Sequence, residues 1–281
     1  MMLEKSKAAF IGSGVMGEAM IKGLLTGKLM DPARITAADI RPERGQELKQ
    51  RYGISFAADN AAAVDGADVV VLSVKPQVLP EVMPSLQGRV PKGALVLSII
   101  AGAKLSGIVE GLAHASVVRA MPNTPAQIGE GMTVWTSSPS VTEIQKGQAK
   151  QILGALGVEV YVEDEDLLDV ATALSGSGPA YVFLFMEALV DAGVHLGFSR
   201  QLAEQLVLQT VKGSVDYAMH TSQHLARLRN QVTSPGGTTA EAMYYLEKAG
   251  FRTAISRAVW AAFQRSVELG KGKKRSDLEK D

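Results

Sequence analysis

Short hydrophobic runs alternate with amphipathic stretches through the first half of the chain. Strands are predicted at Ala8–Ile11, Ile35–Asp39, Val69–Ser73, Leu95–Ile100, Val117–Ala120, Met132–Thr136 and Glu159–Val162. Helices are expected between them, including Glu43–Tyr52, Leu79–Pro84 and Leu105–Leu112. This alternation predicts an α/β fold with helices on both faces of a parallel sheet, a Rossmann-type doubly wound arrangement.

The strand pattern stops near residue 165, after the acidic run Glu163–Asp166. Four helices are expected beyond it, at Tyr181–Leu196, Arg200–Met219, Thr239–Ala249 and Arg252–Leu269. We therefore predict a dinucleotide-binding domain over residues 1–164 and an all-α dimerisation and substrate-binding domain over 165–281. The stretch Tyr181–Val194 is apolar nearly all round, so we expect a second copy of the chain to cover it in a homodimer.

A glycine-rich turn joins the first strand to the helical residues that follow. Its residues are Gly12, Ser13, Gly14, Val15, Met16 and Gly17. In a dinucleotide site the first glycine makes the turn, the second admits the pyrophosphate, and the third lets helix and strand pack closely. The phosphates would bind to main-chain amides at the helix N-terminus.

The choice of cofactor depends on the end of the second predicted strand. Asp39 lies about 20 residues after the glycine turn, where an acidic residue favours the free ribose 2′-hydroxyl of NAD. Arg41 follows it, and an arginine at this place favours the 2′-phosphate of NADP. The cofactor is therefore NAD(H) or NADP(H), and Arg41 can also be read as a solvated turn residue.

Two further loops follow predicted strands, at the sheet edge where such folds bind ligands. Ser73, Val74, Lys75 and Pro76 form the first, although Lys75 can also be read as an ordinary loop lysine. The second, from Arg119 to Ala126, has two prolines and includes Asn123, and it either lines the nicotinamide end or is a purely structural turn.

The helical half contains a second glycine-rich loop, with Ser234, Gly236, Gly237, Thr238 and Thr239. Helix-start amides and the Ser234 and Thr239 hydroxyls would form a cradle for a carboxylate. Thr238 and Glu241 have the spacing of a capping box, so Thr238 is also expected to cap the helix. The small-residue turn Leu174–Tyr181, which includes Ser177, either approaches a ligand or serves a close helix crossing.

Composition removes several classes of function. Lysines and arginines equal aspartates and glutamates at 29 each, so charge offers no argument for a nucleic-acid or membrane partner. The chain has no cysteine, and its four histidines lack metal-ligand spacing, so we expect no metal site. Ser175 and Ser177 lack a His and acid constellation for acyl transfer. With no leader-like segment and no run of about 18 apolar residues, we expect a cytoplasmic protein without a membrane span.

These motifs together resemble pyrroline-5-carboxylate reductases. The matching residues are Phe10–Gly17, Val74–Gln77, Met121–Pro125, Leu174–Tyr181, Asp191–Gly193 with Gly197, and Ser234–Thr239. The resemblance implies that NAD(P)H reduces 1-pyrroline-5-carboxylate, a small imino acid, to L-proline. It also implies an interlocked homodimer that commonly assembles into decamers, with the Ser234–Thr239 loop meeting the partner's cofactor domain.

The same resemblance implies roles for individual residues. Asn60, Ser73–Pro76 and the loop around Ala101 match cofactor-contacting positions, beside the Gly12–Gly17 loop. Ser234, Gly236, Gly237 and Thr239 match positions that hold the substrate carboxylate and ring nitrogen, with Ser234 and Thr239 as the catalytic candidates. Glu165 is a further candidate that could reach the substrate amine. Asp39 departs from the small hydroxyl residues or arginine that the family often has there, which weakens a simple NADP preference.

Two alternatives remain open from the sequence. A reductase of similar plan that acts on a hydroxy acid or another imine usually needs an acid/base lysine, and Lys212 is the weak candidate for it. A non-catalytic NAD(P)-binding regulator should have lost the Ser234–Thr239 loop or the Leu174–Tyr181 turn, and both are intact.

Overall fold

The structure is a computed structural model that describes residues 3–271. Contacts group residues 3–177 with 262–271 in a first compact unit, and residues 178–261 in a second. The division therefore falls at the start of a helix, and the last helix begins in the second unit and ends in the first. The predicted domain boundary at 164/165 differs from this grouping and stays a prediction.

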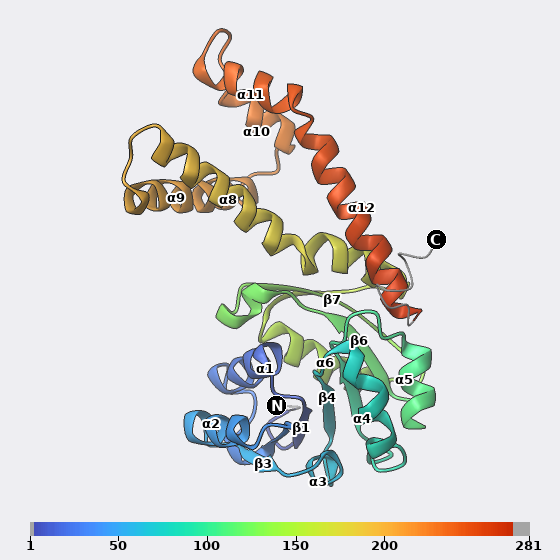
Figure 1. Cartoon of the computed structure of the whole chain (residues 1–281). Coiled ribbons are helices and arrows are strands. Elements are labelled where there is room, and N and C mark those ends of the chain that lie inside the picture. The colour runs from blue at the N-terminus through green and yellow to red at the C-terminus, as the bar shows by residue number, and fades with distance from the viewer. Residues whose placement is uncertain (1–2, 272–281) are drawn as a thin grey trace. The chain divides into compact units, whose positions relative to one another are not determined.

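The first unit contains an eight-stranded sheet in the order β3-β2-β1-β4-β5-β6-β7-β8 (Figure 1). The strands are β1 (Ala8–Ile11), β2 (Ile35–Ala38), β3 (Ser55–Ala57), β4 (Val69–Leu72), β5 (Leu95–Ser98), β6 (Val117–Met121), β7 (Gly131–Ser137) and β8 (Gly157–Tyr161). Its helices are α1 (Val15–Thr26), α2 (Pro42–Tyr52), α3 (Asn60–Val64), α4 (Leu79–Leu86), α5 (Leu105–Leu112), α6 (Glu143–Gly154) and α7 (Leu167–Ala171). Short turns are η1 (Pro32–Arg34), η2 (Pro76–Val78), η3 (Thr124–Ile128) and the π-helical η4 (Thr172–Gly176).

Two apolar cores cover the two faces of this sheet. One joins β-strand residues such as Phe10 to Ile21 of α1, Leu48 of α2 and Ile152 of α6. The other packs the opposite face, where alternate strand residues meet α3, α4 and α5. Every residue of β1, β4 and β5 is buried, as central parallel strands require. The predicted Rossmann-type doubly wound α/β fold is confirmed.

The pairing of β6 with β7 departs from the all-parallel prediction. Met121 pairs with Val134 in an antiparallel ladder, whereas every other neighbouring pair in the sheet is parallel. Nine residues, 122–130, join β6 to β7. A parallel crossover needs a dozen or more residues, so this short connection turns the chain back beside itself.

The second unit is entirely helical in its regular structure, as predicted. It holds α8 (Gly178–His195), α9 (Arg200–Met219), α10 (Leu225–Gln231), α11 (Thr238–Lys248) and the first part of α12 (Phe251–Gly270). The sequence did not predict α10. Helices α8 and α9 pack closely where Gly193 faces Ala203, since a β-carbon on this glycine would lie 3.2 Å from the alanine side chain.

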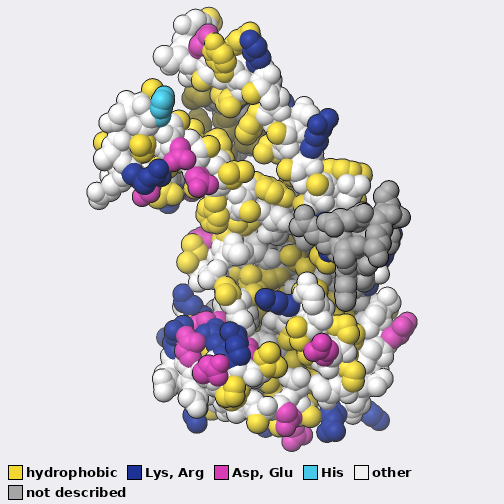
Figure 2. Space-filling model, in the orientation of Figure 1, with side chains coloured by type: hydrophobic (Ala, Val, Ile, Leu, Met, Phe, Trp, Pro, Cys, Tyr) yellow, Lys and Arg dark blue, Asp and Glu magenta, His cyan; other side chains and the backbone are white. Residues whose placement is uncertain are grey.

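Large apolar side chains are exposed along α8 in the single chain. Phe183 is 62% exposed and Leu184 67%, and Figure 2 shows many hydrophobic side chains on the surface of the helical unit. The segment Leu167–His195 is long and apolar enough to cross a membrane by length and composition. The expectation that the chain has no membrane span stays a prediction, since Asp169, Glu187 and Asp191 interrupt the apolar residues of this segment.

Candidate functional site

The glycine turn after β1 lies against the end of the neighbouring strand β4. Gly12 has φ +86°, and a β-carbon there would lie 2.8 Å from Val74 Cγ1 and 3.0 Å from the Ser73 main chain. The Ser73 hydroxyl donates a hydrogen bond of 2.6 Å to the Gly12 carbonyl. A β-carbon on Gly17 would lie 2.8 Å from the same carbonyl oxygen. Both positions therefore need glycine, for the turn and for close packing of α1 on the sheet.

Gly14 has a different environment. It is the N-cap of α1, and no described atom lies within 4 Å of a β-carbon built on it. No side chain among the described residues caps this helix. The first amides of α1, from Val15 to Gly17, have no acceptor within the helix, so they can bind an anionic group that approaches over Gly14.

A cavity of about 450 Å³ opens at this edge of the sheet, where the strand order reverses between β1 and β4. Predicted cofactor residues line much of it: Gly12, Gly14, Asp39, Arg41, Asn60, Ser73, Val74 and Lys75. Ligands of open α/β sheets bind at such a reversal. The shape and the donors fit the pyrophosphate and ribose of a dinucleotide, and each residue's contact with the cofactor stays a prediction.

Other predicted cofactor residues support the cavity from outside its lining. Ser13 is buried and hydrogen-bonds to Asp39, while Met16 packs on the core. Val15 is 63% exposed beside Gly14, and Pro76 starts η2. Ala101 lies after β5, where neighbouring Gly102 approaches Gly270 of α12.

Asn123 has both ends of its side-chain amide engaged within the first unit. Its Nδ2 donates to the Ser175 carbonyl at 3.0 Å, and its Oδ1 accepts from the Met132 amide at 2.9 Å. These contacts tie the loop after β6 to Ser175 in η4. Such bonds give Asn123 a structural role, and its predicted cofactor contact stays a prediction. The small-residue turn predicted at Leu174–Tyr181 is instead helical, with Ser177 between η4 and α8.

Asp39 is held at the end of β2 by donors on both sides. Its Oδ2 accepts from the amide and hydroxyl of Ser13 at 3.1 and 3.2 Å, and its Oδ1 accepts from the amide and Nε of Arg41, both at 3.1 Å. Burial alone would raise the pKa of Asp39, but the hydrogen bonds from Arg41 and Ser13 outweigh it and the pKa lies below its ordinary value. Asp39 is therefore anionic at neutral pH.

The second glycine-rich loop leads into α11. Gly236 has φ +70°, and Gly237 is the N-cap of the helix, without a side-chain cap among the described residues. The expectation that Thr238 caps the helix is wrong, because Thr238 is already the first helical residue. Amides at this helix start, including Thr238 and Thr239, lack acceptors within the helix and can bind a carboxylate.

One amide of this loop already has a partner. The Gly237 N–H donates to the Ser234 carbonyl at 3.0 Å, and a β-carbon on Gly237 would lie 3.2 Å from that oxygen. The predicted use of the Gly237 amide for a substrate would therefore require this turn to open.

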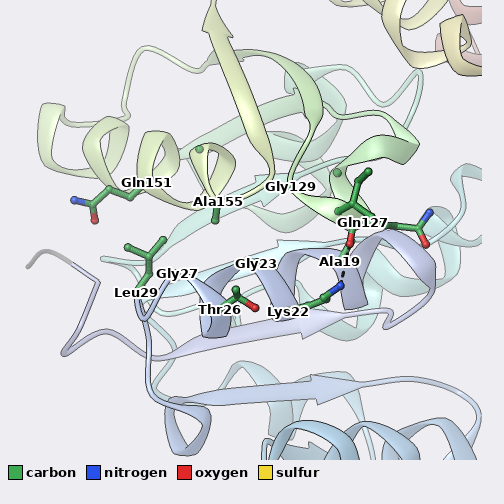
Figure 3. Close-up of a pocket in the computed structure, with 13 residues that line it drawn as sticks. Ala19, Lys22, Gly23, Thr26, Gly27, Leu29, Gln127, Gly129, Gln151 and Ala155 are labelled. Atoms are coloured by element: carbon green, nitrogen blue, oxygen red, sulfur yellow. Dashed lines mark hydrogen bonds between the residues drawn. The ribbon is translucent and has the colours of Figure 1, made fainter. Parts of the chain in front are cut away.

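A larger cavity lies elsewhere in the first unit. It encloses about 610 Å³ between α1, η3 and α6, and its lining includes Lys22, Gln127 and Gln151 (Figure 3). None of the predicted site residues lines it. Lys22 donates to the Gln127 carbonyl at 3.2 Å across its edge. Cavity size alone therefore does not mark the candidate site in this fold.

Comparison with known proteins gives a consistent family. Residues 165–269 match the family described as pyrroline-5-carboxylate reductase dimerisation. A pyrroline-5-carboxylate reductase of Synechocystis sp. is 44% identical over 261 residues, which cover 93% of this chain and 97% of that protein. The chain belongs to the pyrroline-5-carboxylate reductase family.

Other matches cover both units. Residues 7–102 match the family described as NADP oxidoreductase, coenzyme F420-dependent. A pyrroline-5-carboxylate reductase of Corynebacterium melassecola is 41% identical and covers 94% of this chain and 98% of that protein. The crystal structure of a Plasmodium falciparum pyrroline carboxylate reductase with NADP bound superposes with a TM-score of 0.88 at 33% identity, covering 95% and 99% of the two chains. The chain is thus an NAD(P)H-dependent oxidoreductase.

Within this reductase, a buried charged cluster lies behind β6 that sequence reasoning missed. Arg119 donates to Glu165 at 2.9 Å and to Asp169 at 3.2 Å, and Ser266 of α12 donates to Asp169 at 2.7 Å. Glu165 also accepts from the Leu105 amide at 2.8 Å. These bonds make Glu165 structural, and its predicted contact with a substrate amine stays a prediction.

A signal for this cluster was present in the sequence. Arg119 interrupts the apolar run of β6, and Asp169 interrupts the apolar start of α7. A charged residue inside a buried strand needs a partner, so such interruptions mark paired groups. The sequence does not say which two meet.

Lys212, the weak acid/base candidate of the alternative reductase, lies on the surface of α9. Its ammonium donates to Asp216 at 2.5 Å, one helical turn away, and its side chain is 71% exposed. This arrangement is typical of a solvated helix pair rather than of a catalytic lysine.

Proposed function

We propose that this chain reduces 1-pyrroline-5-carboxylate to L-proline with NADH or NADPH, the last step of proline biosynthesis. The observation that carries the proposal is the presence of two uncapped helix N-termini entered through glycine turns, at α1 and α11. Each can bind an anion through main-chain amides. A dinucleotide pyrophosphate suits the first and a small ring carboxylate suits the second.

The substrate carboxylate is assigned to the Ser234–Thr239 loop. The amides of Gly236, Thr238 and Thr239 and the Ser234 hydroxyl supply its donors, with Gly237 giving the close main-chain approach. The Gly237 amide joins them only after its bond to the Ser234 carbonyl opens. This differs from the simplest expectation, in which Gly236 and Gly237 alone provide the amides.

The main catalytic contribution of the protein is to orient the substrate and the cofactor. Bound NADH or NADPH supplies the hydride that adds to the imine carbon. The Thr239 hydroxyl accepts the N–H of the protonated imine and keeps the ring nitrogen oriented; that nitrogen retains its proton in the product. A near-attack geometry is worth about 7–11 kcal/mol in favourable systems, so no strong acid is required. Ser177 and Glu165 remain candidate substrate contacts.

The assembly is proposed to be an interlocked homodimer, with decamers as a further assembly. Support comes from the dimerisation family matched by residues 165–269 and from the exposed apolar side chains of α8. A second copy would cover the face that otherwise meets the criteria of a membrane span. We therefore propose a cytoplasmic enzyme with no membrane or nucleic-acid partner.

A direct assay tests the proposed reaction. Purified full-length protein is mixed with pyrroline-5-carboxylate and either reduced cofactor, and cofactor absorbance and proline are measured together. We expect cofactor oxidation and proline to appear in equal amounts. An acyclic imine and a 2-hydroxy acid, the latter with oxidised cofactor, serve as comparison substrates. Faster turnover of either one, or cofactor binding without turnover of any, contradicts the proposal.

A further inference from the structure

We infer that Asp39 makes this protein select NADH over NADPH, by accepting the ribose 2′-hydroxyl and excluding a 2′-phosphate. The inference deepens the proposed function, and for its activity readout it rests on that function. Asp39 lines the cavity beside the glycine turn, together with Gly12 and Gly14. The ribose that follows a pyrophosphate bound at α1 belongs at this end of β2.

The Asp39 carboxylate is fixed in place before any ligand binds. Its side chain is 8% exposed, and main-chain amides of Ser13 and Arg41 each donate to a different oxygen at 3.1 Å. The other donors, the Ser13 hydroxyl and Arg41 Nε and Nη2, belong to side chains that can rotate away. Their rotation would free a lone pair for a ribose hydroxyl, whereas a phosphate dianion has no proton to donate at neutral pH.

Arg41 does not reverse this preference. Its Nε lies 3.1 Å from Asp39 Oδ1, and its side chain is 56% exposed. To hold a 2′-phosphate, the guanidinium would have to leave Asp39. The carboxylate would then face the phosphate without its partner, and two like charges at contact distance repel strongly.

The neighbouring arginines of α2 are already paired. Arg44 Nε donates to the Ser13 carbonyl at 2.9 Å, and its guanidinium also contacts Glu18 and, at 2.7 Å, Glu47. Arg51 donates to the same two glutamates at 2.5 and 2.7 Å. Figure 2 shows acidic and basic side chains intermixed near α2. This cluster supports the glycine loop from behind and offers no uncompensated cation for a phosphate.

The lining of a second cavity beside Asp39 also carries charges of both signs. This cavity encloses about 480 Å³, shares Asp39 and Asn60 with the first, and has Asp59 and Arg89 in its lining. Arg89 is the cation on this second lining by which a 2′-phosphate could be held, and Asp59 on the same lining opposes it. Lys75 lines the first cavity, but it follows β4, and β1 lies between β4 and β2 in the sheet.

Direct titration of the cofactors tests the inference without any imine. The dissociation constants of NADH and NADPH are measured by nicotinamide fluorescence for the wild type, Asp39→Ser and Asp31→Ser. Asp31→Ser is the matched control, because Asp31 lies before β2, at the end opposite Asp39, and lines neither cavity. Serine can still accept from the Ala33 amide, from which Asp31 accepts at 2.8 Å. Asp39→Asn is a second variant of the same size, used if Asp39→Ser does not fold.

We expect the wild type to bind NADH at least about tenfold more tightly than NADPH, a difference near 1.4 kcal/mol. Asp39→Ser should reduce that ratio at least about tenfold, and Asp31→Ser should leave it unchanged. Equal or tighter binding of NADPH by the wild type overturns the inference. So does an unchanged ratio in both Asp39 variants.

Failure of the inference can be told apart from failure of the proposed function. Selective NADH binding without imine reduction supports the role of Asp39 and contradicts the proposed reaction. Proline formation with a preference for NADPH does the reverse. Ratios of kcat/KM for the two cofactors should follow the ratios of the dissociation constants in every variant that is active.

Discussion

Arg119 and Asp169 form a buried ion pair, 3.2 Å apart, with side chains only 3% and 4% exposed. The pair joins β6 to α7, and Ser266 of α12 donates to the same carboxylate oxygen. Residues far apart in the chain thus share one desolvated charge centre. Removing Arg119 leaves the Lys104 ammonium, 3.4 Å away, as the remaining charged partner of the buried Asp169. A buried charge left without any compensation costs about 3–5 kcal/mol, which is the upper limit for this change.

Arg119→Met should therefore lower the free energy of unfolding by up to about 3–5 kcal/mol, measured by urea denaturation. Lys146→Met is the matched control, because it breaks an ion pair of the same unit, with Glu143, whose acidic side chain is 87% exposed. We expect that control to leave the midpoint nearly unchanged, since exposed pairs contribute little. Similar losses in both variants would contradict the importance of burial.

Gly12 and Gly14 should respond differently to alanine. In Gly12→Ala, the new residue would have a positive φ, and its β-carbon would lie 2.8–3.0 Å from atoms of Val74 and Ser73. We therefore expect a loss of about 1–3 kcal/mol in stability. Gly14→Ala meets no described atom within 4 Å and has φ −66°, so the fold should keep its melting temperature. Its methyl group would nevertheless occupy the approach of the phosphates, and cofactor affinity should fall. A stable Gly12→Ala would refute this reading of the turn.

Thr239 should matter for the reaction more than for the fold. Thr239→Ala is expected to lower kcat/KM for pyrroline-5-carboxylate at least about tenfold, or 1.4 kcal/mol, if its hydrogen bond tightens in the transition state. Thr239→Ser keeps the hydroxyl and should restore most of the activity. Steady-state kinetics at saturating cofactor separates kcat from KM. An alanine variant with wild-type kcat/KM would exclude Thr239 from the mechanism.

Glu18 should make part of the stability depend on pH. Burial alone raises its pKa, but hydrogen bonds from Arg44, Tyr52 and Arg51 hold the pKa below the ordinary 4.5. A lowered folded-state pKa means that the stabilisation is complete above pH 4.5 and is lost as the pH falls through the folded value.

Glu18→Gln should therefore be less stable than the wild type near neutral pH, and the difference should shrink in acid. Unfolding curves measured from neutral pH down to about pH 3 check this, below the ordinary pKa of glutamate. Glu43→Gln, at an exposed position of α2, provides the control and should track the wild type. A constant difference between Glu18→Gln and the wild type across that range would disprove the linkage.

The exposed face of α8 should hold the dimer together. Phe183→Glu places a charge where a 62% exposed ring is expected to be covered by the second copy, so the dimer dissociation constant should rise at least about tenfold. Ile144→Glu alters a 66% exposed residue of α6 in the first unit and should leave assembly unchanged. Sedimentation velocity over a range of concentrations reports both. A wild-type monomer at all concentrations would remove this role of α8.

Local patterns in the sequence determined most of the secondary structure and the glycine turns. Fully apolar, β-branched runs such as Val69–Leu72 indicated buried strands, and Gly12 and Gly17 are required by close main-chain contacts within one βα unit and its neighbour. The helical character of the second unit followed from apolar periodicity. Short elements, among them β3 and α10, carried too few residues for a periodic signal.

Tertiary structure decided whatever depends on partners distant in the chain. The parallel pairing of β7 with β8 joins two strands separated in the chain by α6, and the structural use of Glu165 follows from Arg119, 46 residues away. The sequence placed Asp39 near a ribose but could not show that main-chain amides fix its carboxylate. Periodicity and glycine positions are local properties that a single stretch of chain reveals. The charge state and partners of a buried side chain arise only when separate segments are brought together and water is excluded.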